Sequence, residues 1–278
     1  MQDKILIIKA TGEREAFNPL KLRYSLEKAK AAPEIIERIL THIKMELKEG
    51  MTTRDIYSHA FNLLERESKP IALRYSLRNA VIEMGPTGFP FEQLIAEIMC
   101  VKGFETRTDF TAKGECVEHE IDVVAWNENR LIMIEAKFHN EFGIKSDLKT
   151  ALYVKARWGD LEEKEFDTFG QKRKLDEGWL ITNTKFTEQA IRYALCRNMK
   201  LIGWNFPQKG NLQDLIEDTG LHPITALKSI SSSHKKALME AGIIHVKQFT
   251  ENLDVAKQCN IPSDKVEQAV LEIKQILN

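Results

Sequence analysis

The chain lacks an excess of charge of either sign. Its 278 residues include 40 Lys and Arg against 41 Asp and Glu, so the formal net charge is -1. A protein that binds polyanions over its whole surface is therefore not indicated, and any nucleic-acid contact must use local patches. Long apolar runs are missing too, because the N-terminal run of residues 5–8 is short and no stretch approaches membrane-spanning length. We therefore expect a cytoplasmic protein without a membrane partner.

Cysteine is scarce and scattered. None of the four cysteines forms a Cys-x-x-Cys pair, which argues against a zinc ribbon and against a disulfide framework. We expect buried free thiols at all four positions, which are Cys100, Cys116, Cys196 and Cys259.

Two segments rich in Gly and Pro, at residues 85–90 and 205–210, interrupt the regular patterns of the chain. The length also exceeds one average domain. Together they predict a multidomain protein of α plus α/β class, with units at residues 1–87, 88–208 and 212–278.

The first unit shows a strand-like run at residues 5–9, a turn at Thr11-Gly12 and then apolar residues at helical spacing. It reads as a mostly helical domain with a small N-terminal hairpin. Its predicted helices are one through Leu22, Leu26 and Ala29, and others at residues 34–47, 53–67 and 71–84.

The second unit alternates strand-like and helical segments, which predicts a mixed sheet flanked by helices. The third unit reads as short helices and is too small for a catalytic domain of its own. In the second unit we predict strands at residues 104–108, 120–126, 130–138, 179–182 and 200–204, and helices at 91–101, 145–156, 161–175 and 188–197; in the third we predict helices at 224–228, 234–241, 246–251 and 264–277.

Three polar residues stand in or at the end of apolar strands of the second unit. Asp122 lies in Ile-Asp-Val-Val, and Glu135 and Lys137 end Ile-Met-Ile-Glu-Ala-Lys. A turn at residues 127–129 predicts an antiparallel hairpin. Because side chains alternate along a strand, Glu135 and Lys137 share one face, and the hairpin can bring Asp122 beside Glu135.

Phosphodiester hydrolysis requires this combination of groups. Carboxylate oxygens hold Mg²⁺ or Mn²⁺, the metal lowers the pKa of a bound water, and a cation stabilises charge that develops on the phosphate. Asp122 and Glu135 would bind the metal and Lys137 would act on water and phosphate. The alternative is an exposed Glu-x-Lys pair of little energetic value, but charges placed in apolar strands favour a site.

The pattern Phe91-Glu92, His119-Glu120-Ile121-Asp122 and Glu135-Ala136-Lys137 resembles the PD-(D/E)xK nuclease superfamily, close to Mrr-like restriction endonucleases. The resemblance spans the middle unit and implies a mixed sheet flanked by helices, Mg²⁺ and DNA cleavage. It also implies a catalytic acid on the helix before the first strand, at Glu92. Four further residues are candidate helpers, although a surface role is the expected one for each: His119, Glu120, His139 and Gln171.

The first unit resembles the ATP-cone, a nucleotide-binding regulatory module. The resemblance rests on residues 7–9, 15–18, 52–56 and 72–75 together with Gly12, Lys21 and Leu22. It implies an ATP or dATP effector, with phosphate contacts from Lys9 and Lys21. The alternative is a helical domain used only for dimerisation or protein contact. The residues implied for the base and sugar are Glu15, Phe17, Asn18, Thr53 and Tyr57.

The third unit resembles a helix-hairpin-helix module over residues 227–238 and 240–243. Such a module grips DNA phosphates through backbone N–H groups at a helix N-terminus. Lys235 and Lys236 would reinforce that contact. Ser229 and Ser231 stand where the usual hairpin has glycines, and a packing role stays equally open.

These observations predict a DNA endonuclease of restriction or genome-defence type under ATP or dATP control, active as a monomer or homodimer. One alternative is a DNA-binding regulatory protein whose nuclease fold is inactive. Another is a structure-specific nuclease such as a junction resolvase, which would share the same metal chemistry.

Overall fold

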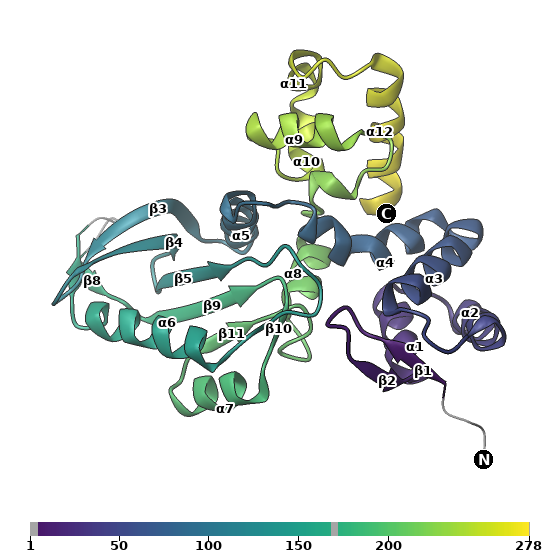
Figure 1. Ribbon diagram of the computed structural model, residues 1–278. Helices are drawn as coiled ribbons and strands as arrows, with labels where there is room; N and C mark the ends of the chain where they lie inside the picture. The colour runs from purple at the N-terminus through teal and green to yellow at the C-terminus, as the bar shows by residue number, and fades with distance from the viewer. Residues whose placement is uncertain (1–4, 168–171, 278) are drawn as a thin grey trace.

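The computed structural model describes residues 5–167 and 172–277. Three units lie along the chain (Figure 1). Gln171 falls outside the described residues. Within the described ranges, no helix is both long enough and apolar enough to cross a bilayer.

The N-terminal unit is a helical bundle with one small hairpin, as predicted. Strand β1 pairs antiparallel with β2, and the side chain of Asn18 caps the helix that follows by accepting from Leu20 N at 2.9 Å. A capping box of Thr52 and Asp55 begins another helix. The elements are β1 (Leu6–Ile8), β2 (Arg14–Ala16), α1 (Pro19–Lys28), α2 (Pro33–Glu46), α3 (Thr53–Glu67) and α4 (Lys69–Ile82).

The central unit is built on a five-stranded mixed sheet with the order β11-β9-β5-β4-β3. The β3, β4 and β5 strands run antiparallel, whereas β5, β9 and β11 run parallel, which confirms the predicted mixed sheet. The strands of the sheet are β3 (Glu105–Lys113), β4 (Glu118–Trp126), β5 (Leu131–Lys137), β9 (Glu177–Thr182) and β11 (Lys200–Ile202).

Helices cover both faces of the sheet (Figure 1). On one face, α5 (Phe89–Val101) and α8 (Leu212–Thr219) share an apolar cluster with β4, β5, β9 and β11. On the other face lie α6 (Leu148–Leu161) and α7 (Glu188–Cys196), which pack on side chains such as Leu180 and Leu201. The nuclease-like unit therefore has three layers.

The predicted helix at residues 161–175 is wrong. Helix α6 ends at Leu161, and two short strands follow, β7 (Glu165–Phe166) and β8 (Arg173–Lys174), which pair antiparallel. Phe166 and Leu175 pack with Leu161 in one apolar cluster. The chain turns back between Phe166 and Leu175, so these two residues are buried from two antiparallel segments and do not belong to one helix face. The residues between them offer no apolar pattern of period 3.6.

The helix predicted at residues 145–156 also starts too early. Residues Lys145–Ser146 form β6, which pairs parallel with β10 (Lys185–Phe186). Asp147 then caps α6 by accepting from Thr150 N at 3.1 Å. An N-cap residue is itself not helical, so the helix begins only after it.

The C-terminal part contains helices that the sequence patterns did not reveal, α8 and α11. Leu212, Leu215 and Ile216 of α8 belong to the apolar cluster of α5 and the sheet, so this helix packs on the central unit. The remaining elements share a separate cluster. They are η1 (Ile224–Ala226), α9 (Ser232–Glu240), α10 (Val246–Glu251), α11 (Leu253–Gln258) and α12 (Ser263–Leu277).

The C-terminal unit rests on helix α4 of the N-terminal unit (Figure 1). Leu73 of α4 joins the C-terminal apolar cluster. Thr225 donates to the Ala80 carbonyl, and Lys228 pairs with Glu65 of α3 at 2.6 Å. Units far apart in the sequence are thus joined through α4.

The cysteines correct another expectation. All four are free thiols, as predicted, but Cys100, Cys116 and Cys196 are exposed and Cys259 is half-buried. A solvent-facing thiol is not excluded by composition, because residue type alone does not fix which face of a helix or loop points outward.

Candidate active site

The β4–β5 hairpin brings Asp122 and Glu135 together. Its turn is held by Asn127, whose side chain accepts from the backbone N–H groups of Asn129 and Arg130, each at 3.0 Å. The strands pair antiparallel, with Val123 opposite Ile134. One residue beyond that pair, the Asp122 carboxylate accepts a hydrogen bond from Ala136 N at 2.7 Å. The predicted hairpin is confirmed.

Alternation along β5 separates the apolar and the polar side chains at this end of the strand. Ile134 and Ala136 point to the α5 side and join its apolar cluster. Met133 packs on the α6 side, so Glu135 and Lys137 lie on the α6 face as well. Lys137, at the strand end, is exposed.

Burial disfavours the ionised form of both hairpin carboxylates. The pKa of Glu135 is raised to about 7, first by burial and then by the neighbouring Asp122, although Arg157 and Lys137 lower it. Burial also raises the pKa of Asp122, against the Ala136 N–H bond, which lowers it. Two neighbouring acids whose ionised forms are both disfavoured by burial favour the binding of a cation between them.

Glu92 on helix α5 lies within electrostatic reach of the same carboxylates. It lies in the first turn of that helix, and its pKa is raised to about 7, first by burial and then by Asp122. Gly88 makes room for it, since a Cβ there would lie 3.0 Å from Glu92 Oε1. The acid that the resemblance implied is therefore electrostatically coupled to the hairpin acids.

Sequence reasoning missed Asp109 as part of this acidic group. The pKa of Glu92 is raised by Asp109 and Glu120 as well as by the hairpin acids. Pairing between β3 and β4 skips from Thr108 to Phe110, and Asp109 has φ 53°. Asp tolerates this left-handed conformation better than most residues. A single Asp in a Thr-rich strand gave no periodic signal that would have revealed it.

Arg157 of helix α6 was also missed. Its guanidinium donates to the Glu135 carboxylate and to the Glu120 carbonyl, and it lies over the Tyr153 ring at 5.3 Å. The Arg157 and Glu135 side chains are only 13% and 19% exposed. Arg157 is 22 residues from Glu135 in the sequence, and only the packing of α6 on the sheet brings them together.

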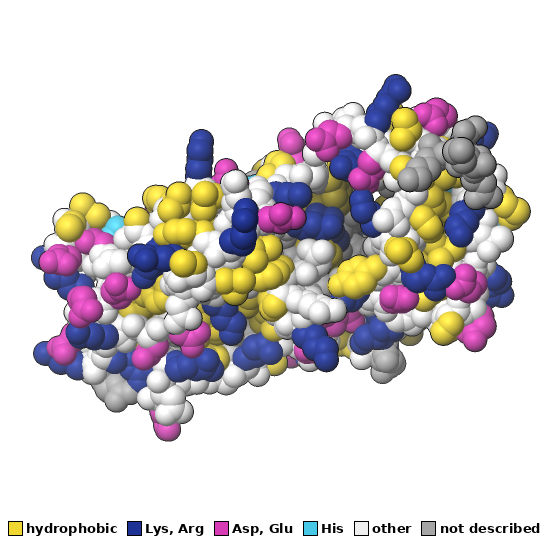
Figure 2. All heavy atoms as spheres, turned by 90° about the horizontal axis from the view of Figure 1, so that it is seen from below, with side chains coloured by type: hydrophobic (Ala, Val, Ile, Leu, Met, Phe, Trp, Pro, Cys, Tyr) yellow, Lys and Arg dark blue, Asp and Glu magenta, His cyan; other side chains and the backbone are white. Residues whose placement is uncertain are grey.

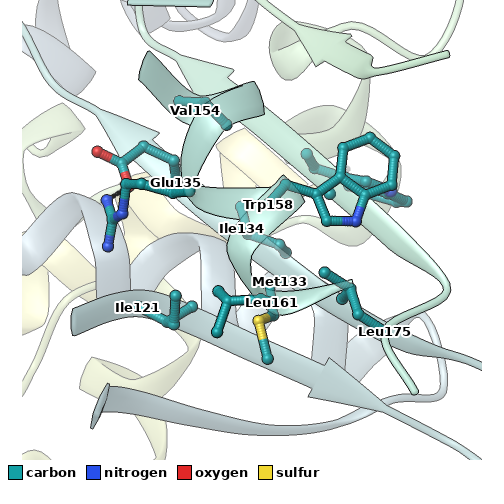
Figure 3. Close-up of a pocket in the computed structure, with 11 residues that line it drawn as sticks. Ile121, Met133, Ile134, Glu135, Val154, Trp158, Leu161 and Leu175 are labelled. Atoms are coloured by element: carbon teal, nitrogen blue, oxygen red, sulfur yellow. Dashed lines mark hydrogen bonds and ion pairs between the residues drawn. The ribbon is translucent and has the colours of Figure 1, made fainter. Parts of the chain in front are cut away.

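Apolar side chains enclose the inner side of Glu135 (Figure 3). A cavity of about 30 Å³ lies between the sheet and α6, with Glu135 and Arg157 at one end and Trp158, Leu161 and Leu175 deeper inside. Figure 3 shows the Glu135 carboxylate pointing away from these apolar groups. The apolar lining explains the desolvation of Glu135, because a charged carboxylate loses hydration there.

The donor set suits a hard divalent cation. Glu92, Asp122 and Glu135 offer only oxygen atoms, which Mg²⁺ and Mn²⁺ prefer. After burial, the charge of Asp122 is the next cause of the raised pKa values of both glutamates. Among the described residues, these three acids are not a group whose ligand atoms all lie within 4.8 Å of one another. A bound ion would therefore draw the side chains closer and compete with Arg157 for Glu135.

The other candidate helpers have structural partners. His119 bonds to Asp160 at 2.8 Å, and Asp160 also accepts from Cys116 N. The His119 bond first, and then the Cys116 bonds, hold the pKa of Asp160 well below its usual range. His139 bonds to Ser146 at 3.2 Å, and burial lowers its pKa. Glu120 is exposed, but its charge reaches Glu92.

The residues predicted for nucleotide binding fall into separate places. Glu15 pairs with Lys21 at 2.9 Å and with Lys9 at 3.2 Å, so these three form one cluster. Two others have structural roles, because Phe17 packs on the N-terminal core and Asn18 caps α1.

Thr53 and Tyr57 lie on α3. Tyr57 stacks on Tyr75 at 4.9 Å and lines a cavity of about 270 Å³ that Thr225 and Lys228 of the C-terminal unit also line. No hydrogen-bond partner for the buried Tyr57 hydroxyl is found within the described ranges. Tyr57 therefore faces the interface with the C-terminal unit.

The serine-rich segment of the C-terminal unit begins a helix. Ser231 caps α9 by accepting from His234 N at 3.2 Å. Lys235 donates to the Thr225 carbonyl at 2.9 Å, and burial lowers its pKa. Lys236 is exposed and pairs with Glu240. Only Lys236 of these two lysines is free to meet a large ligand without rearrangement.

Two family models match parts of this chain. Residues 85–205 match the family model described as "Restriction endonuclease", so the three-layer unit is a restriction endonuclease domain of the Mrr type. Residues 222–277 match the model described as "AF1548-like, C-terminal". Both matched segments lie beyond the N-terminal unit.

The chain is also similar to one whole protein. It is 35% identical over 184 residues to an uncharacterized protein of Archaeoglobus fulgidus, and the match covers 66% of this chain and 99% of that protein. The crystal structure of AF1548, a protein of unknown function, matches with 33% identity and a TM-score of 0.55, over 69% of this chain and 98% of that chain. The chain belongs to this AF1548-like family.

Proposed function

We propose that the protein is a Mg²⁺-dependent DNA endonuclease of restriction or genome-defence type. The observation that carries the proposal is the group of Glu92, Asp122 and Glu135. Burial raises the pKa of each, and Asp122 adds to the raised pKa of both glutamates. Arg157 pairs with Glu135 but does not offset the burial of the other two acids, which favours a cation site over a purely structural role.

Each residue has a definite task in this proposal. Asp122 and Glu135 hold the metal ion, and the Ala136 carbonyl adds an oxygen ligand. A bound Mg²⁺ or Mn²⁺ supplies Lewis-acid activation of water and phosphate. Lys137, exposed at the strand end, orients the attacking water and meets the charge that develops on the phosphate. Glu92 completes the oxygen set from the side of α5.

Nucleotide control by ATP or dATP is the second part of the proposal. Its support is the Lys9, Glu15 and Lys21 cluster, which has two ammonium groups suited to phosphate. The tip of the β1–β2 hairpin touches the central unit, because a Cβ on Gly143 would lie 2.9 Å from Thr11. Gly143 follows β5 by a few residues, so movement of the hairpin would reach the loop after Lys137.

Further cations of the N-terminal and central units lie near the contact between the β1–β2 hairpin and the loop after β5. Burial lowers the pKa of Lys185, and Arg78, Lys21 and Lys145 lower it further, so these cations lie within electrostatic reach of one another. Figure 2 shows Lys and Arg side chains gathered in and around the hollow near the centre of the face seen from below. Such local charge attracts a polyanion although the net charge is -1.

The deciding experiment is a cleavage assay on modified and unmodified DNA, on branched DNA and on RNA, with Mg²⁺ or Mn²⁺ and with or without ATP or dATP. Nicks or breaks in DNA duplex that disappear with a chelator support the proposal. Binding without cleavage in every condition would instead identify a regulatory DNA-binding protein with an inactive nuclease fold. Cleavage restricted to junctions would identify a structure-specific nuclease. Sedimentation of the active species shows whether it is a homodimer, which two cuts in two strands would favour.

A further inference from the structure

A second group of possible metal ligands lies in the N-terminal unit, away from the nuclease residues. His42 and Glu46 are four residues apart on α2, so they share one face of the helix. His59 reaches the same place from α3. Within residues 5–167 and 172–277, these are the side chains that form a group of three with one ligand atom each, all within 4.8 Å of one another.

Glu46 stands between the two imidazoles. Its Oε1 lies 3.1 Å from His42 Nε2, and its Oε2 lies 3.4 Å from His59 Nδ1. The rings are perpendicular, with centroids 5.1 Å apart. Ligand atoms around one transition-metal ion are held about 2.0–2.2 Å from it and hence roughly 3–3.5 Å from each other. Both distances from Glu46 to the imidazoles already lie in this range, and all ligand atoms of the group lie within 4.8 Å of one another.

The packing beneath the group keeps the two helices in place. Ile39 and Ile43 of α2 and Ile56 and Ala60 of α3 belong to one buried cluster, so the backbone positions are set by the core. The three side chains above it retain freedom to adjust, since His42, Glu46 and His59 are 40%, 51% and 24% exposed. A rigid base with adjustable ligands allows an ion to enter from solvent.

We propose that His42, Glu46 and His59 form a binding site for a divalent transition-metal ion such as Zn²⁺, Co²⁺ or Ni²⁺. Two imidazole nitrogens and one carboxylate are ligands of this class of ion, and solvent completes the coordination. Mg²⁺ prefers an all-oxygen ligand set, so we expect this site to discriminate against Mg²⁺. The bound ion joins α2 to α3 and stabilises the N-terminal unit, independently of the nuclease chemistry.

The test is calorimetric titration of the full chain with Zn²⁺ in excess Mg²⁺, which occupies the all-oxygen nuclease centre. We expect one Zn²⁺ site in the wild type. His59→Ala and Glu46→Gln should each weaken it at least tenfold, which corresponds to about 1.4 kcal/mol. Glu46→Gln is the safer variant for folding, because Glu46 is the most exposed of the three. Circular dichroism and melting without metal check that each variant is folded.

Two matched variants separate this site from other sources of Zn²⁺ binding. His234→Ala removes a histidine of the C-terminal unit and Glu135→Ala removes a nuclease carboxylate, and both should keep the Zn²⁺ site. With Co²⁺, the wild type should give a visible absorption band that His59→Ala lacks. Wild-type affinity no higher than that of folded Glu46→Gln, or loss of Zn²⁺ binding in Glu135→Ala, would overturn the proposal.

Discussion

Arg157 donates to the carboxylate of Glu135, so a helix residue supplies the positive charge nearest to the central acid of the candidate active site. The Arg157 charge lowers the pKa of Glu135, although burial and Asp122 prevail and keep it raised. A buried pair of this kind yields little net stability after desolvation. Its consequence is functional, since a metal ion must compete with Arg157 for the same carboxylate.

Replacing Arg157 tests this competition. Arg157→Ala should tighten Mg²⁺ binding by a factor of about 10, because a single charge-assisted contact is worth about 1.5–3 kcal/mol and part of that is recovered by the metal. Calorimetric titration with Mg²⁺ in the absence of DNA measures it. Lys155→Ala is the matched control, since Lys155 lies on the same helix but pairs with Glu162. Equal Mg²⁺ affinity in the wild type and Arg157→Ala would show that Arg157 and metal do not compete.

Replacing Glu135 tests the metal centre itself. Glu135→Ala should keep the fold and reduce Mg²⁺-dependent cleavage at least about 100-fold, because it removes a direct ligand and loss of even an outer partner can cost about 10–100-fold. Single-turnover cleavage of plasmid DNA gives the rate. Glu128→Ala is the control, because it changes a carboxylate in the hairpin turn rather than in the site. Undiminished cutting by Glu135→Ala would refute the assignment of the site.

Stability should respond to pH at the same residue. The pKa of Glu135 is raised from 4.5 to about 7 in the folded protein, so the folded state holds the proton more tightly. Its contribution to stability is present below about pH 4.5 and is lost as the pH rises through 7. Without metal, Glu135→Gln should therefore be more stable than the wild type above about pH 8, by on the order of 2 kcal/mol.

Denaturant unfolding at several pH values, with a chelator present, measures this difference. The gain of Glu135→Gln should vanish near pH 4.5, where the wild-type carboxyl is also neutral. Added Mg²⁺ should reverse the order at high pH, because it stabilises only the wild type. A difference that is constant over the whole pH range would mean that Glu135 has an ordinary pKa.

Cleavage should also depend on pH. Both Glu92 and Glu135 have pKa values raised to about 7, and a carboxylate must lose its proton to bind metal. At limiting Mg²⁺ the rate should rise with pH through about 7 and level off above it, and saturating Mg²⁺ should shift the rise to lower pH. A pH–rate profile at two Mg²⁺ concentrations measures both effects. An identical profile at both concentrations would exclude competition between protons and metal.

Nucleotide binding can be tested at the hairpin cluster. Lys9→Ala and Lys21→Ala should each weaken ATP or dATP binding about 10-fold, because each removes one ammonium group from the phosphate contact. Calorimetry on the full chain is the measurement, and Lys44→Ala on α2 serves as a control for general loss of charge. No heat of binding with either nucleotide in the wild type would remove nucleotide control from the proposal.

The sequence by itself determined the central hairpin and most of the helices. Apolar alternation and the Asn127 turn predict β4 and β5, and the structure pairs them as expected. Helical periodicity gives α3 and α10 at the predicted bounds. These features succeed because they depend on residues close together in the chain, where periodicity and turn chemistry act locally.

Only the tertiary structure decided which distant groups meet. Arg157 reaches Glu135 because α6 packs across the sheet, and Asp109 joins Glu92 because β3 lies at the edge of that sheet under α5. The false helix at residues 161–175 has the same origin, since Phe166 is buried in a cluster of sheet residues together with Leu161 at the end of α6. Burial and charge at these positions depend on long-range packing, which no local pattern records.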